Sequence, residues 1–120
     1  WGPARRGRRE GRGKEIMKGR LADVYFQAVL AGRLSEYARG YTFEYLESYQ
    51  GPPISLTMPV TERRYEFSDF PPFFDGLLPE GPQLEALLRQ AKLDRHDLMG
   101  QLITVGSDLV GAVTVKEVRS

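Results

Sequence analysis

The chain has 120 residues, of which 41% are hydrophobic and 28% are charged, and its net charge is +1. This length fits one domain with one hydrophobic core and excludes a two-lobed enzyme. The composition is that of an ordinary globular protein and excludes the disordered, collagenous and membrane classes. Cysteine is absent and His96 is the only histidine. Disulfides, thiol nucleophiles and histidine-rich metal sites are therefore excluded as well.

Two features bear on the cellular location. No stretch reaches the roughly 18 consecutive apolar residues of a membrane helix, and no apolar run with a cleavage site follows the N-terminal arginines. The absence of cysteine fits a reducing compartment. We therefore expect a cytoplasmic protein that makes no membrane contact.

Charge is divided unevenly along the chain. Residues 1–20 hold eight basic side chains against two acidic ones, a local net charge of +6. The remaining 100 residues hold nine basic and fourteen acidic side chains, a net charge of −5. Residues 1–16 have few apolar side chains, so we expect a disordered basic arm or extension. Because Met17 is a natural start, residues 17–120 are expected to form the folded module.

The basic arm has one functional interpretation. Closely spaced cations attract nucleic-acid phosphates through the release of counterions. The arm lacks the interleaved aromatic residues of single-strand binders and any predicted helix, so we expect at most weak or indirect nucleic-acid contact. The candidate contact residues are Arg5, Arg6, Arg8, Arg9 and Arg12.

The first part of the module is predicted to form strands. Three segments have strand character and are separated by a short turn near residues 27–28 and a break at 38–40: LADVYF (21–26), VLAGRL (29–34) and YTFEYL (41–46). In the third segment aromatic residues occupy every second position, which is typical of a half-buried strand. After a Gly-Pro-Pro break, ISLTMPV (54–60) is predicted to be a short strand that ends at Pro59.

The middle of the chain has helical periodicity. A first helix is predicted to begin at Pro71-Pro72 and to stop at Pro79, and a second begins at Pro82. Their apolar positions are Phe70, Phe73, Phe74, Leu77 and Leu78 in the first, and Leu84, Leu87, Leu88 and Ala91 in the second.

A third helix and a last strand complete the module. Asp94 is placed to cap the helix, with Asp97 three residues later, and Gly106 is placed to stop it. Leu98, Leu102 and Val105 are expected to face inward. The β-branched segment LVGAVTVKEV (109–118) is predicted to be a strand that rejoins the sheet. This order predicts an α+β fold, with about three helices on one side of a small, largely antiparallel sheet.

Two segments look chemical at first. Arg95-His96-Asp97-Leu98 resembles a scrambled kinase catalytic loop, but Leu102 stands where a metal-binding Asn would be, so we interpret it as a helix N-terminus. Gly13-Lys14-Glu15 lacks the Ser or Thr of a phosphate-binding loop. We therefore expect no catalytic residue, no cofactor and no metal ion.

The most distinctive local feature is FFDGLLPEGP (73–82), which places a Pro-Glu-Gly-Pro corner between two apolar helices. Such a corner projects outward, and it is either a plain helix–helix connection or a partner-binding loop. The candidate partner-binding residues are Phe73, Phe74, Pro79, Glu80, Gly81, Pro82 and Leu84.

Three segments together resemble the N-terminal subdomain of HipA-type serine/threonine kinases: PPISLTMPV (52–60), FFDGLLPEG (73–81) and LMGQLITVGSDLVGAVTV (98–115). The resemblance extends from about Arg20 to Val118. In HipA toxins this subdomain precedes a kinase body that supplies the ATP loop, the catalytic Asp and the metal ligands. None of those motifs is present here, so the resemblance implies a protein that is not an enzyme.

The arrangement is similar to that of HipS-like antitoxins, the small subunits of three-component HipBST systems. The resemblance implies that the subunit docks on a HipT- or HipA-like kinase and directs its corner toward the active site. In HipS-like relatives a Trp follows Pro-Glu-Gly, whereas this chain has Pro82. The alternative is an assembly or adaptor module, or a truncated HipA N-terminal fragment, that contributes to a complex of a HipB-like DNA-binding protein with DNA.

Overall fold

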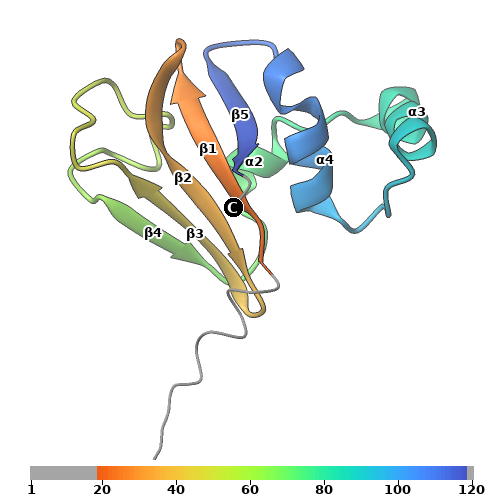
Figure 1. Ribbon diagram of the computed structural model, residues 1–120, viewed down its shortest axis with the longest axis horizontal. Coiled ribbons are helices and arrows are strands. Elements are labelled where there is room, and N and C mark those ends of the chain that lie inside the picture. Colours follow the sequence, from red (N-terminus) through yellow and green to blue (C-terminus); the bar gives the residue numbers. More distant parts are fainter. Residues whose placement is uncertain (1–18, 119–120) are drawn as a thin grey trace, which may run out of the picture.

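Five antiparallel strands form one sheet in the computed structural model of the protein, which describes residues 19–118. The strands are β1 (Leu21–Phe26), β2 (Val29–Tyr37), β3 (Gly40–Tyr45), β4 (Arg64–Phe67) and β5 (Val113–Val118). Their spatial order is β4-β3-β2-β1-β5, so the first four strands form a meander and β5 returns to pair with β1 (Figure 1). The predicted return of the last strand is confirmed.

Three α-helices lie between β4 and β5 in the chain. They are α2 (Pro72–Asp75), α3 (Gly81–Ala91) and α4 (Leu98–Val105), and the 3-10 turn η1 (Gly106–Asp108) follows α4. Helix α4 packs beside β5, whereas α3 stands farther from the sheet (Figure 1). The predicted α+β class, with helices on one side of a small antiparallel sheet, is confirmed.

The core lies between the sheet and the helices α2 and α4. Its fully buried side chains include Val24, Leu34, Phe43, Phe74 and Leu102. The ring of Phe43 on β3 packs against Phe74 on α2, with ring centroids 5.8 Å apart. Each such side chain contributes about 2–3 kcal/mol through burial, so Phe43 and Phe74 fix α2 to the sheet.

The opposite face of the sheet carries charges that alternate in sign from strand to strand. In register across the five strands stand Lys116, Asp23, Arg33, Glu44 and Arg64. Two of the neighbouring pairs form ion pairs, between the Asp23 and Arg33 side chains at 3.1 Å and between the Glu44 and Arg64 side chains at 3.4 Å. This face is a solvated one whose charges largely satisfy each other.

The segment 54–60 is not the strand that its sequence predicts. It forms a loop with a single bridge between Ser55 and Met58. The Tyr45 hydroxyl donates a hydrogen bond to the Met58 carbonyl at 2.6 Å and accepts one from the Ile54 N–H at 3.0 Å. Ile54 and Met58 are buried because this tyrosine holds the loop against the core, and the fourth strand forms later, at Arg64–Phe67.

Helix α4 begins three residues later than Asp94 predicts. Its N-cap is Asp97, whose carboxylate accepts a hydrogen bond from the Gly100 N–H at 3.0 Å. Asp94 instead accepts a hydrogen bond from the His96 N–H at 2.7 Å within the preceding turn. The N-cap position is occupied by the aspartate that Arg20 also contacts, a residue far away in the sequence.

Gly106 ends helix α4, as predicted, but close packing is the stronger reason for a glycine here. A Cβ atom at this position would lie 2.1 Å from the Val115 carbonyl oxygen on β5. Only a glycine therefore lets the end of α4 approach the edge strand this closely. The last strand begins at Val113, so residues 109–112 of the predicted strand form a loop instead.

The basic arm lies outside the described residues, and with it Arg5, Arg6, Arg8, Arg9 and Arg12. The boundary expected between residues 16 and 17 lies there too, so both remain predictions. Within residues 19–118, no helix has the length and apolar character needed to cross a membrane.

Candidate partner-binding surface

The corner, residues 79–82, joins α2 to α3 and is open to solvent. Glu80, Gly81 and Pro82 are exposed, and Pro79 is half-buried. Gly81 has a positive φ of 60°, and a Cβ atom there would meet nothing within 4 Å. The left-handed backbone at Gly81 turns the chain into α3, so the Pro-Glu-Gly-Pro sequence forms the outward corner that it predicts.

The two predicted phenylalanines have different environments. Phe74 is fully buried in the core, so its side chain offers no surface to a partner. Phe73 is half-buried, and its ring packs edge-on against Phe74 with centroids 5.2 Å apart. Of the two phenylalanines, only Phe73 reaches the surface.

Phe73 lines a small depression that we call the apolar hollow, with a volume of about 240 Å³. Its walls are Thr57, Met58, Tyr65, Phe67, Pro72 and Phe73. Leu56, which precedes this wall in the chain, is 95% exposed. Tyr65 and Phe67 come from β4, the strand that the sequence did not predict, so sequence reasoning missed most of this site.

A larger depression, the corner groove, has a volume of about 700 Å³. It is lined by Gly76, Leu77, Leu78, Pro79, Glu80 and Gln83 on the corner side, and by Val105, Asp108, Leu109 and Val110 on the other. Val110 is 97% exposed. Sequence reasoning found the first wall and missed the second, because Leu109 and Val110 have the composition of a strand.

Helix α3 has an apolar side without a buried residue. Leu84, Leu87, Leu88 and Ala91 are all only half-buried. The helix is tied to the turn before α4 by an exposed ion pair, in which Arg95 Nη2 lies 2.7 Å from Glu85 Oε2. Leu84, one of the predicted contact residues, belongs to this half-covered side.

Arg20 joins the start of the sheet to the start of α4. Its guanidinium lies 2.8 Å from Glu36 Oε1 and 2.7 Å from Asp97 Oδ1. These hydrogen bonds, first to Glu36 and then to Asp97, raise the pKa of Arg20, and the bond from Arg20 lowers the pKa of Asp97. Asp97 is thus a capping and ion-pairing residue, as the interpretation of this segment as a helix N-terminus requires.

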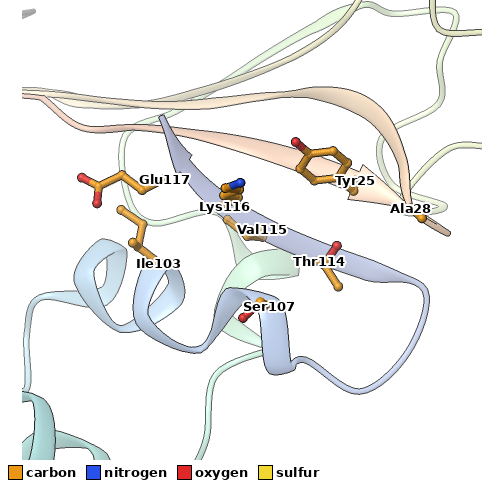
Figure 2. A pocket seen from close by; sticks show the side chains of 8 residues that line it. All are labelled: Tyr25, Ala28, Ile103, Ser107, Thr114, Val115, Lys116 and Glu117. Atoms are coloured by element: carbon orange, nitrogen blue, oxygen red, sulfur yellow. The ribbon is translucent and has the colours of Figure 1, made fainter. Parts of the chain in front are cut away.

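A further pocket of about 640 Å³ wraps around the edge strand β5 (Figure 2). Ile103 on α4 and Ser107 on η1 form one side, and Thr114 and Lys116 on β5 belong to the other. Its lining contains no histidine or cysteine. Within residues 19–118, no group of three His, Cys, Asp or Glu side chains is placed to hold a metal ion.

Comparison with known proteins identifies relatives along nearly the whole described chain. An uncharacterized protein of Haemophilus influenzae is 31% identical over 98 residues, which are 82% of this chain and 92% of that protein. The solved structure of the N-terminal domain of HipA toxin matches with a TM-score of 0.71 and 28% identity, covering 84% of this chain and 94% of that one.

The family model described as the HipA N-terminal domain matches residues 22–116. This span runs from β1 to β5, so it includes the corner, the apolar hollow and the corner groove. The match covers most of the chain, and the solved HipA domain shares both fold and sequence with it. The chain therefore belongs to the HipA N-terminal domain family.

Proposed function

We propose that this chain is a non-catalytic, antitoxin-type subunit that binds a separately encoded HipA-like kinase, of the HipT kind, and inhibits or stabilises it. The match is to the N-terminal domain of HipA, which is not the catalytic kinase part. The observation that carries the proposal is the exposed corner, which lines the corner groove and leads into the half-covered side of α3. Exposed apolar side chains that gather in this way mark interaction sites.

Inhibition would follow from binding alone. The corner presents Glu80, Gly81 and Pro82 on a turn that leads directly into α3. A preformed loop loses little conformational entropy on docking, which favours its use as an inhibitory contact. Pro82 occupies the position at which HipS-like relatives have a Trp. In this chain the corner itself would therefore block the active site sterically, in place of a large aromatic plug.

The test is a binding experiment between the full chain and a HipA-like kinase that lacks an N-terminal domain of its own. We expect the two to co-purify and the autophosphorylation of the kinase to fall in the complex. Binding without a fall in autophosphorylation would support the stabilising role, whereas failure to bind would refute the proposal.

Pro82→Trp sharpens this test. If the corner reaches the active site, a large ring at this position should deepen the inhibition, because Trp buries much area at low entropic cost. Affinity and autophosphorylation are measured on the same samples. Weaker inhibition by the variant would instead mean that Pro82 is needed for the shape of the corner.

A second function is an adaptor, or HipA N-terminal fragment, in a complex that contains a HipB-like DNA-binding protein. The net charge of +6 in residues 1–20 favours it. Its signature is DNA affinity that falls steeply with salt and with deletion of residues 1–16. If the DNA affinity is unaffected by this deletion, the arm does not contribute to DNA binding.

A further inference from the structure

The two walls of the corner groove come from distant parts of the chain. One wall is the segment 76–83, and the other consists of the end of α4 and the loop at 108–110. Leu77 and Leu109 are half-buried and Val110 is 97% exposed. A groove of about 700 Å³ has room for a few side chains of another protein segment.

The charge of the groove is wholly acidic. Glu80 stands on one wall and Asp108 on the other, both exposed, and no lysine or arginine is among the lining residues. No hydrogen bond or ion pair joins either carboxylate to another residue within 19–118. Some other carboxylates are paired with arginines, as in Asp23–Arg33 and Glu85–Arg95, whereas Glu80 and Asp108 are open to a partner's cations.

We propose that the corner groove binds a segment of the kinase in which an apolar side chain is flanked by lysine or arginine residues. Leu77, Leu109 and Val110 would contact the apolar side chain, and Glu80 and Asp108 would pair with the flanking cations from the two sides. Complementary charges of this kind favour the encounter and fix the register of the docked segment. This inference rests on the proposed function and names the chemistry of the surface that the groove contacts.

The acidic character of the whole folded part favours a basic occupant over a second copy of it. Residues 21–120 carry a net charge of −5, so two copies repel each other at this surface. The basic arm of the chain itself has suitable charge, and its deletion is therefore included in the test.

The experiment measures the affinity of the same purified kinase for the full chain, for the chain without residues 1–16 and for three variants, Asp108→Lys, Glu80→Lys and Val110→Ser. Asp108 and Val110 lie outside the corner, so their effects separate the groove from the corner. We expect each charge reversal to weaken binding by about tenfold at low salt and by less at high salt, because screening shortens the reach of charges. Val110→Ser should weaken binding by about threefold at either salt concentration.

Glu47→Lys and Glu62→Lys are the matched controls. Both glutamates are exposed and line neither the groove nor the hollow, and each control makes the same change of charge. They should leave the affinity within about twofold of the original value. Circular dichroism and thermal unfolding of every variant confirm that the fold is kept.

The outcomes distinguish the two proposals. If the original chain binds the kinase and the Asp108 and Val110 variants bind equally well, the groove inference is overturned and the proposed function stands. If the controls weaken binding as much as Asp108→Lys does, general charge and not the groove explains the affinity. If deletion of residues 1–16 strengthens binding tenfold, the arm is the occupant. If the original chain does not bind, both proposals fail.

Discussion

The sheet and helix α3 differ in how completely their apolar side chains are covered. On the sheet, Ala22, Val24, Leu34 and Phe43 are fully buried. On α3, no residue is buried, and its leucines are only half-covered. The sheet region therefore completes its own core, whereas the region of the corner and α3 keeps apolar surface available. This difference places the candidate partner-binding surface on the side of the molecule that contributes least to its stability.

The comparison predicts unequal costs for truncating apolar residues in the two regions. Phe43→Ala removes a fully buried ring and should lower the free energy of unfolding by about 4 kcal/mol. Leu87→Ala on α3 should lower it by about 1 kcal/mol, because the side chain is already half-exposed. Urea unfolding measures both values. Equal costs would mean that α3 belongs to the core as fully as β3 does.

The link between the sheet and α4 predicts a pH dependence. The carboxyl pKa of Asp97 is lowered in the folded protein, so its ionised form stabilises the fold above its unfolded pKa of about 3.9. This stability is lost as the pH falls through the lower folded pKa. Asp97→Asn keeps a capping side chain and loses the ion pair with Arg20.

We therefore expect Asp97→Asn to cost between about 1 and 2 kcal/mol near neutral pH, a moderate value because both partners are partly exposed. The difference from the original chain should shrink below about pH 4 and vanish in more acidic solution. Unfolding curves across this range provide the measurement. A difference that stays constant with pH would contradict the role assigned to the ion pair.

The smallest expected effect concerns the corner. Gly81→Ala places a Cβ atom on a residue with a φ of 60° and should destabilise the fold by about 1 kcal/mol. Gly76→Ala is the control, since Gly76 has a φ of −66° and a Cβ atom there makes only ordinary contacts at 3.5 Å. Thermal unfolding compares the two variants. If Gly76→Ala destabilises the fold as much as Gly81→Ala does, the left-handed backbone at Gly81 has no special role.

Local patterns predicted those elements whose burial follows a regular period. The alternation of Tyr41, Phe43 and Tyr45 predicts β3, and the run of β-branched residues predicts β5. The strand predicted at 54–60 was wrong because its apolar residues Ile54 and Met58 are held in the core by a tertiary contact. The hydroxyl of Tyr45 is hydrogen-bonded to the backbone of both residues. Strand β4 was missed because it has only four residues, half of them charged.

The candidate site was predicted only where it is continuous in sequence. The corner follows from its prolines and glycine, and so does its exposure. The second wall of the groove could not be predicted from a local sequence pattern, because residues 76–83 and 105–110 meet only when α4 packs beside β5. The core position of Phe74 could not be distinguished from the surface position of Phe73, since adjacent residues on a one-turn helix share the same local pattern.

Hydrogen exchange of the full chain, alone and with a HipA-like kinase that lacks this domain, tests the central claim most directly. In the free chain, amides of α3 and the corner should exchange faster than those of β1–β3, because locally less buried regions open more easily. On addition of the kinase, protection should appear at residues 76–91 and 105–110 while kinase autophosphorylation falls. Protection confined to the charged face of the sheet, or no change at the corner, would contradict the account.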